Sequence, residues 1–286
     1  NAFKNKDWSV SVGANATFVK NKIKNLPATM KENGYISGSK KWLEGKSIYE
    51  FWLRQWHGVD PQTGDGLYVA DVSKYNQGNI GTGDGNITQS QFDEYKKTVV
   101  TIDGKELTNS YTYAKYDFSG SSIPDVYGGF NVRVSYKNFE LAAVFSYQLG
   151  GQILDTNYAT MMSMTEFGYA QSPDLLKAWK QAGDITEVPR IDNSAAHTTN
   201  IGQSYSTRWL TSSDYLNLRS VTIGYQLPKT WLSKVMLKSA RLNLTAENLF
   251  MLKARQGLIP MANYSGVTYN EYMPSRNITL GLNVSF

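Results

Sequence analysis

The sequence contains no cysteine, which excludes disulfide bonds and thiol chemistry and leaves the redox compartment open. It also has no run of 18 apolar residues, so it predicts no transmembrane helix. Charged residues make up only 19% of the chain, and the net charge of +5 is spread without a basic block. This distribution gives no electrostatic footprint for a nucleic acid. The chain opens without the positive and then apolar segment of a signal peptide, and a strand so close to its start suggests a fragment.

Motifs of catalytic or metal chemistry are missing as well. The histidines, His57 and His197, lie in unrelated segments without an HExxH pair, and neither a nucleophile elbow nor a phosphate-binding loop occurs. The stretch GDGNITQSQFDEY resembles a calcium loop only in part, because Ile80 and Gln91 stand where the anchoring carboxylates belong. The sequence therefore predicts a protein that is not an enzyme and that uses neither a metal nor a cofactor.

Alternating strands are what the sequence does have. Its 41% hydrophobic residues, 19 Tyr and 24 Gly, together with many Asn, Ser and Thr, favour strands and turns. In GGFNVRVSY and FELAAVFSYQL the apolar residues fall on one face, and only Lys137 and Asn138 separate the two segments. A two-residue hairpin pairs Tyr136 with Phe139 on the same face, in agreement with the alternation. The same criteria give eight candidate strands, near residues 8–19, 46–57, 66–72, 128–136, 139–149, 215–227, 239–250 and 276–286.

The connections between these strands alternate between short and long. Short connections are expected at 59–66, 137–138 and 228–238, and long ones at 21–45, 71–127, 150–214 and 251–274. This asymmetry is typical of outer-membrane barrels, in which short turns are periplasmic and long loops are external. Residues 172–183 are expected to form a helix, with Ser172 as its N-cap and Pro173 at its first position. A phase slip among the apolar residues predicts a β-bulge near Ser220.

The polar face of the predicted strands carries small residues and a few charges. A charge at mid-bilayer costs about 2–4 kcal/mol, so the strand charges should line a water-filled lumen. They are Glu50, Arg54, Arg133, Arg241 and Glu247. Small inward residues such as Ser11, Gly13 and Gly224 suit a wide lumen better than a tightly filled small barrel. Aromatic residues such as Trp42, Trp179 and Trp209 either stack on a ligand or pack in an aromatic girdle or a loop core.

A series of segments resembles the SusC/RagA-type family of TonB-dependent outer-membrane transporters. They are, in order, EGKSIYEFWLRQWHGVDPQTGDGLYV, DVYGGFNVRVSYKNFELAAVFSYQLGGQI, STRWLTSSDYLNLRSVTIGYQLPKTWL, ARLNLTAENLFML and PSRNITLGLNVSF. They cover nearly the whole chain and are jointly specific. The resemblance implies an all-β, transmembrane antiparallel barrel of about 22 strands that a plug fills. Residues 1–286 would be a C-terminal portion of this barrel, about its last eight strands, without the plug and the first strands.

The resemblance further implies a multi-pass protein of the outer membrane of a Gram-negative bacterium. Such transporters import oligosaccharides or peptides with a SusD-like surface lipoprotein as a lid, and a TonB complex supplies the energy. The predicted lumen charges would contact substrate, the plug or the rest of the wall, the barrel exterior would contact lipid, and Trp42, Trp179 and Trp209 would lie near ligand or lid. Phe286, at the periplasmic edge, resembles the signal that the assembly machinery reads. The alternatives are a soluble β-sandwich that acts as a carbohydrate-binding or adhesin module, and a small stand-alone barrel or outer-membrane enzyme.

Overall fold

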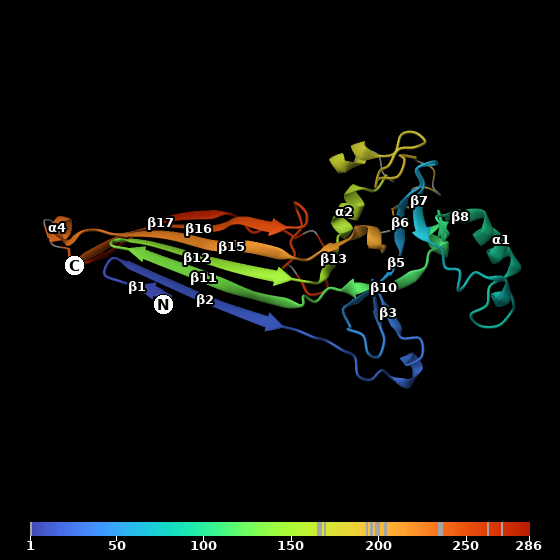
Figure 1. Cartoon of the computed structure of the whole chain (residues 1–286), viewed down its shortest axis with the longest axis horizontal. Coiled ribbons are helices and arrows are strands. Elements are labelled where there is room, and N and C mark those ends of the chain that lie inside the picture. The colour runs from blue at the N-terminus through green and yellow to red at the C-terminus, as the bar shows by residue number, and fades with distance from the viewer. Residues whose placement is uncertain are drawn as a thin grey trace.

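The long strands of the chain form one antiparallel sheet, here called the wall sheet. A computed structural model describes residues 2–164, 168, 170–192, 194, 197, 201–202, 205–233, 237–261, 263–269 and 271–286. Within these residues the strand order is β1-β2-β11-β12-β15-β16-β17 (Figure 1). The strands are β1 (Phe3–Lys4), β2 (Trp8–Phe18), β11 (Val126–Tyr136), β12 (Phe139–Leu149), β15 (Tyr215–Gln226), β16 (Ser239–Lys253) and β17 (Asn277–Ser285). No helix in the described ranges is long and apolar enough to cross a membrane.

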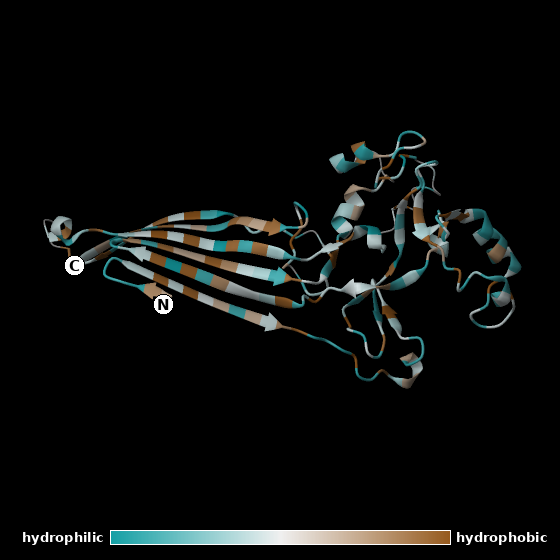
Figure 2. Ribbon diagram, viewed as in Figure 1, coloured by the Kyte–Doolittle hydropathy of each residue, from teal (hydrophilic) through white to brown (hydrophobic). Residues whose placement is uncertain are grey.

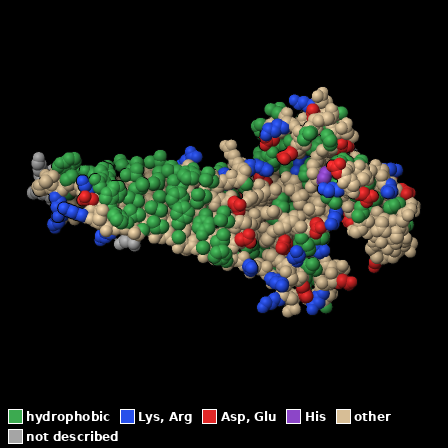
Figure 3. Space-filling model, viewed as in Figure 1, with side chains coloured by type: hydrophobic (Ala, Val, Ile, Leu, Met, Phe, Trp, Pro, Cys, Tyr) green, Lys and Arg blue, Asp and Glu red, His purple; other side chains and the backbone are tan. Residues whose placement is uncertain are grey.

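The two faces of the wall sheet differ in the way that the alternation predicts. Paired residues share a face, and Ile223 of β15 lies between Leu141 of β12 and Leu244 of β16. The apolar face remains exposed, with Ile278 and Leu280 at 72% and 68%. The alternation is visible along the strands in Figure 2, and Figure 3 shows an almost unbroken band of hydrophobic side chains over the sheet. A β-sandwich would bury this face against a second sheet, so the alternative of a soluble sandwich is wrong.

Aromatic side chains border the exposed apolar band at the end where the turns lie. Trp8, Tyr136, Phe139 and Tyr225 occupy neighbouring positions on β2, β11, β12 and β15. The ring centroids of Trp8 and Tyr136 are 4.4 Å apart, and those of Phe139 and Tyr225 are 4.5 Å apart. Towards the other end, Tyr147 follows Phe139 eight residues later on the same face, about 27 Å along the strand. That length is of the order of the ~25 Å apolar band that aromatic girdles border in outer-membrane barrels.

The hairpin and the bulge that the sequence predicts are both present. Tyr136 pairs with Phe139, and Lys137 takes a positive φ of 50°, as a tight hairpin turn requires. The register of β15 against β16 shifts between Leu218 and Ser220, which brings the residues on both sides of the bulge onto the apolar face. The phase slip in the sequence therefore comes from a local bulge inside one continuous strand.

The long connections lie at one end of the wall sheet and the short turns at the other, as predicted (Figure 1). We call these the loop end and the turn end. Residues 137–138 and the described part of 227–238, which includes the short helix α4 (Lys229–Leu232), lie at the turn end. The described parts of residues 19–125, 150–214 and 254–276 lie at the loop end, and we call them the loop body.

The prediction of eight wall strands is wrong in its second and third members. β2 pairs directly with β11 along its whole length, so neither 46–57 nor 66–72 enters the wall. Those segments form β5 (Glu50–Arg54), β6 (Trp56–Val59) and β7 (Gly66–Val69) of the loop body. The predicted periplasmic turn at 59–66 accordingly lies in the loop body. Apart from the short β1, the wall sheet contains six strands in the described part of the chain.

Short strands and helices build the loop body. They are η1 (Ala28–Met30), β3 (Tyr35–Ser37), β4 (Lys40–Trp42), η2 (Gln77–Asn79), α1 (Gln89–Thr98), β8 (Val99–Ile102), β9 (Lys105–Thr108), η3 (Tyr111–Tyr113), β10 (Tyr116–Ser121), β13 (Gln152–Leu154), α2 (Thr156–Met161), η4 (Pro173–Lys177), η5 (Thr207–Trp209) and β14 (Leu210–Ser212). The predicted helix at 172–183 is only the 3-10 turn η4, although Ser172 caps it and Pro173 begins it as expected. One apolar core joins the three long connections of the loop body. Leu53 of the first connection and Leu154 of the second are fully buried in this core, and Val267 of the third packs against it.

Candidate functional site

An ion cluster lies on the polar face of the wall sheet, near the turn end. The Glu140 carboxylate on β12 is 3.1 Å from Arg241 Nη2 on β16 and 3.6 Å from Arg133 Nε on β11. Arg241 Nε also donates to Asn243 Oδ1 at 2.8 Å. One carboxylate thus holds two guanidinium groups across four adjacent strands, and the cluster keeps one net positive charge on the face opposite the apolar band.

A glycine makes room for this cluster. Gly224 of β15 lies between Glu140 and Asn243 in the sheet register. A Cβ atom there would lie 2.6 Å from Arg241 Nη2, so a larger residue would displace the guanidinium. Because residue 224 has no side chain, Arg241 can cross over β15 to reach Glu140 on the next strand.

Of the charges predicted to line a lumen, Arg133, Arg241 and Glu247 lie on the polar face of the wall. Glu247 lies opposite Ser220 and Asn277, and Asn277 Nδ2 donates to its carboxylate at 3.4 Å. The sequence analysis did not select Glu140. Its place on the polar side of the alternating segment FELAAVFSYQL is the signal that could have found it.

The prediction is wrong for Glu50 and Arg54, which do not lie on the wall. They occupy the two ends of β5, which pairs with β10 in the loop body. Arg54 Nε donates to the carbonyl oxygen of Tyr111 at 2.9 Å, and the guanidinium lies over the rings of Tyr111 and Tyr116. These contacts fix Arg54 within the packing of the loop body.

The predicted loop tryptophans take different positions in the loop body. Trp209 is 2% exposed and belongs to the apolar core, so for this residue the expectation of a place near ligand or lid is wrong. Trp179 donates from Nε1 to the carbonyl oxygen of Pro61 at 3.0 Å, which fixes it against another loop segment. Trp42 is partly exposed and packs against Tyr35 with ring centroids 5.3 Å apart.

A cleft of about 730 Å³ with a mixed polar and apolar lining opens between the second and third long connections, and we call it the loop cleft. It is lined by Asp155, Asn157, Tyr158, Thr160, Met161, Gln171, Ser172, Pro173, Asp174, Arg255, Gln256, Gly257, Leu258, Ile259, Thr268, Tyr269 and Glu271. The buried Asp155 joins its two sides, because its carboxylate contacts Arg255 Nη1 at 3.1 Å and accepts from Thr268 Oγ1 at 3.2 Å. The same carboxylate caps α2 by accepting from the backbone N–H of Tyr158.

The lining of the loop cleft is acidic and rich in hydrogen-bonding groups. Its described lining includes the carboxylates of Asp155, Asp174 and Glu271 and the guanidinium of Arg255, which lies 3.6 Å from the Tyr158 ring centroid. Hydrogen bonds from Lys177 and from the Tyr158 hydroxyl hold the pKa of Asp174 below its ordinary value, so this carboxylate stays charged. The cleft offers carboxylates, amides and the exposed ring of Tyr269, groups that bind polar, extended ligands such as peptides or oligosaccharides.

Curated relatives match the chain over almost all of its length. TonB-dependent receptor P3 of Formosa agariphila is 26% identical over 99% of the chain, and TonB-dependent receptor P39 of the same organism is 24% identical over 99%. The chain is similar to TonB-dependent receptors. It spans about 27% and 30% of the lengths of these two relatives. No family model matches the chain.

Solved structures show the same fold. A structure of the RagAB peptide transporter covers 99% of the chain with a TM-score of 0.76 at 23% identity. The RagAB peptide importer in its closed-closed state covers 99% with a TM-score of 0.73 at 24% identity. The chain spans 28% of each of these chains. The predicted resemblance to SusC/RagA-type transporters and the predicted fold class of a transmembrane antiparallel β-barrel are therefore confirmed.

The names of these relatives also bear on chemistry. They name receptors and a peptide transporter, and none of the three names an enzyme. Within the described ranges, no group of three His, Cys, Asp or Glu side chains could hold a metal ion. The candidate functional site consists of two surfaces, the polar face of the wall and the loop cleft.

Proposed function

We propose that this chain is a C-terminal part of the barrel wall of a transporter in the outer membrane of a Gram-negative bacterium. The observation that carries the proposal is the two-faced wall sheet, whose apolar face is exposed between aromatic side chains while its polar face holds the ion cluster. A sheet of this kind is stable where one face contacts lipid and the other contacts water. The placement of all long connections at one end supports the same orientation, with the loop body outside the cell.

The substrate would be an oligosaccharide or a peptide, captured first at the loop cleft. The volume of about 730 Å³ and the mixture of carboxylates, amides and an exposed tyrosine ring support a polar ligand of that size. From there the substrate would pass along the polar face of the wall, where Arg133, Arg241 and Glu247 contact the substrate or a plug. The titles of the similar RagAB structures name a peptide transporter, which favours peptides as the first class to test.

The transport cycle would need partners beyond this chain. We propose a SusD-like surface lipoprotein that closes over the loop body and a TonB complex that supplies energy through the plug side. The names of the curated relatives support the dependence on TonB, and the two-component name RagAB supports a second protein. The partly exposed Trp42 and Trp179 are candidates for contact with substrate or lid.

Uptake by cells tests this proposal. A strain that lacks the complete transporter is complemented with the wild-type gene, and the disappearance of peptide and oligosaccharide mixtures from the medium is measured by mass spectrometry. The import that complementation restores should stop when a protonophore is added, and the protein should fractionate with the outer membrane. Recovery in the soluble fraction, or uptake of both classes unchanged by the deletion, would refute the proposed function.

A matched pair of variants tests the loop cleft. Glu271→Gln removes a carboxylate from the cleft lining, whereas Glu187→Gln changes an exposed carboxylate elsewhere in the loop body. The loss of one contact worth about 0.7–1.4 kcal/mol at this exposed carboxylate corresponds to about a 3- to 10-fold weaker apparent affinity for the imported ligand. Glu187→Gln should leave the affinity unchanged. Equal behaviour of the two variants would remove the loop cleft from the transport path.

A further inference from the structure

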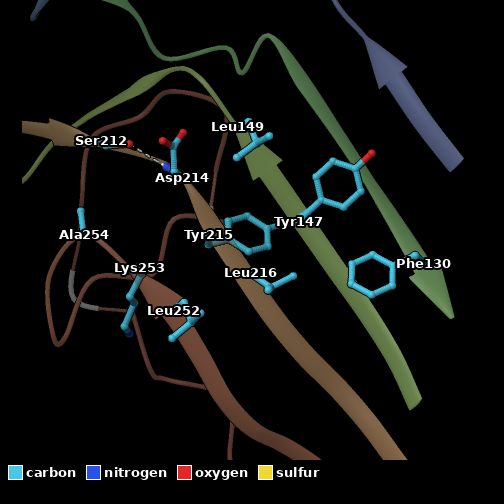
Figure 4. A pocket seen from close by; sticks show the side chains of 10 residues that line it. All are labelled: Phe130, Tyr147, Leu149, Ser212, Asp214, Tyr215, Leu216, Leu252, Lys253 and Ala254. Carbon is cyan, nitrogen blue, oxygen red and sulfur yellow. Dashed lines mark hydrogen bonds between the residues drawn. The ribbon is translucent and has the colours of Figure 1, made fainter. Parts of the chain in front are cut away.

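A groove of about 560 Å³ lies at the loop end of the wall sheet, and we call it the wall groove (Figure 4). It is lined by Phe130, Tyr147, Leu149, Ser212, Asp214, Tyr215, Leu216, Leu252, Lys253 and Ala254. The register assigns its main apolar members to the exposed apolar face, because Tyr147 pairs with Leu216 and Leu216 pairs with Leu252. The wall groove therefore lies on the face opposite the ion cluster, away from the proposed transport path.

A glycine and a tyrosine explain why the sheet is hollow here. Tyr147 lies opposite Gly128 on β11, and its hydroxyl donates to the backbone oxygen of Asn15 on β2 at 3.1 Å. The ring thus reaches across β11 towards β2, away from β15 and β16, and Figure 4 shows it pointing away from Leu252. A Cβ at residue 128 would overlap the Asn15 carbonyl oxygen, so only glycine permits this approach. The surface over Leu216 and Leu252 is left uncovered, and Leu252 is 60% exposed.

The groove has an apolar floor and a polar rim. Ser212, Asp214 and Lys253 line its rim at the loop body. Lys253 Nζ donates to the carbonyl oxygen of Leu258 at 2.6 Å, and Asp214 Oδ1 accepts from the backbone N–H of Gly150 at 2.7 Å. Both bonds lead to residues of the loop body, so the two charged groups lie on the loop-body side of the groove. Water would find few partners on the floor, because Leu149, Leu216 and Leu252 offer no polar side-chain atoms.

We propose that the wall groove binds an acyl chain of an outer-leaflet lipid, with the polar head at the rim of Ser212, Asp214 and Lys253. The inference rests on the proposed placement of the chain in an outer membrane. An amphipathic occupant matches an apolar groove that ends beside the polar loop body, and the groove is continuous with the exposed apolar band that would face lipid. Its volume lies within the range of about 300–1,000 Å³ that is typical of sites for small organic ligands.

Filling the groove tests this inference. Leu252→Trp places a large ring over the floor, whereas Leu244→Trp adds the same ring on the same face of the same strand, outside the groove lining. The complete transporter is extracted from its own membrane, and the retained lipid is counted by native mass spectrometry. We expect the wild type and Leu244→Trp to retain one lipid more than Leu252→Trp, with at least a 5-fold loss of that bound population. Tyr147→Phe frees the ring from Asn15 without adding volume and should lower the retained lipid to an intermediate level.

The outcomes separate this inference from the proposed function. If all variants fractionate with the outer membrane and import substrate but retain equal lipid, the acyl-chain site is refuted and the function stands. Retention of a peptide or protein at the groove, lost only in Leu252→Trp, would likewise overturn the lipid assignment. If the protein is recovered outside the membrane, the proposed function itself fails. Circular dichroism of each purified variant should show the wild-type β content, and if Leu252→Trp misfolds, the Tyr147→Phe result decides.

Discussion

Replacement of Gly224 by alanine tests the ion cluster on the polar face. A Cβ at this position would lie 2.6 Å from Arg241 Nη2 and 3.1 Å from its Cζ, so the guanidinium must move away from Glu140. Glycine to alanine at a site of ordinary backbone geometry stabilises a protein by about 0.4–1 kcal/mol, because it restricts the unfolded chain. The Arg241 and Glu140 side chains are 36% and 25% exposed, and the loss of such a partly exposed pair costs about 0.5–1 kcal/mol.

These two contributions nearly cancel, so Gly224→Ala should change the free energy of unfolding by less than about 0.5 kcal/mol. Gly281→Ala is the matched control, because Gly281 lies in the same row of the polar face and no described atom lies within 4 Å of its ideal Cβ. That control should gain the full ~0.4–1 kcal/mol. A second control is Gly224→Ala in an Arg241→Met background, where nothing is displaced and the stabilisation should reappear.

The assay is equilibrium unfolding of the complete protein in detergent, followed by tryptophan fluorescence in urea. The quantity of interest is the coupling energy between positions 224 and 241, which a double-mutant cycle measures directly. We expect a coupling of about 0.5–1 kcal/mol. If Gly224→Ala stabilises the wild type as much as it stabilises Arg241→Met, the glycine does not serve the ion cluster and the reasoning is refuted.

Further predictions concern the loop body and the final residue. Burial lowers the pKa of Lys40 to about 7, although the nearby Glu50 carboxylate opposes this shift. The folded state therefore binds the Lys40 proton less tightly than the unfolded state does. The free energy of unfolding of the loop body should consequently rise by about 2–3 kcal/mol between pH 7 and pH 9. Hydrogen exchange of the β4 and β5 amides, corrected for intrinsic rates, measures this rise in stability. Lys40→Met should abolish the rise. If the rise persists in the variant, a titratable group other than Lys40 causes it. Asp155→Ala removes the N-cap of α2 and the ion-pair partner of Arg255, which should lower the free energy of unfolding by about 3 kcal/mol. Hydrogen exchange should become faster in α2 and in residues 263–269 together. Faster exchange in α2 alone would contradict the role of Asp155 in joining the two long connections. Deletion of Phe286, which is 78% exposed, should lower the amount of protein assembled in cells more than the unfolding free energy of purified protein, and equal losses would argue against an assembly signal.

The wall strands could be predicted because one physical rule governs them. A strand with lipid on one side and water on the other must alternate at every residue, and β2, β11, β12, β16 and β17 do so. The hairpin at Lys137 and the bulge beside Ser220 could also be predicted from the sequence, because each shifts the phase of the alternating apolar residues at a definite position. The orientation of Arg133, Arg241 and Glu247 followed from the same rule.

The sequence analysis failed where packing replaces the two-sided environment. β5 is apolar on both faces, and Phe51 and Leu53 are completely buried between other loop segments. The segments that became β6 and β7 form strands of only four residues, whereas a membrane-crossing strand needs about 9–11. Strand length, applied strictly, would have removed the candidate at 66–72 from the wall, but not the longer candidate at 46–57 that contains Arg54.

The candidate sites were harder to foresee because they depend on register across long connections. Glu140 meets Arg241 only because β12 pairs with β15 and β15 with β16 in one particular alignment. Residues 150–214 separate the first two of these strands, so no local pattern reveals that alignment. The loop cleft unites irregular segments near Asp155 and Arg255, where periodicity carries no information.

The direct pairing of β2 with β11 has a consequence for how the protein assembles. β11 and β12 close over a two-residue turn, whereas β2 and β11 must meet across residues 19–125. The chain entropy of that longer closure costs about 3–4 kcal/mol more than that of the hairpin. The junction of β12 and β15 across residues 150–214 carries a cost of the same order, whereas the hairpin of β11 and β12 closes easily. The junction of β2 and β11, the longest of these closures, is the main kinetic seam. A loop body that folds early would bring the two ends of residues 19–125 together and so shorten the search at this seam.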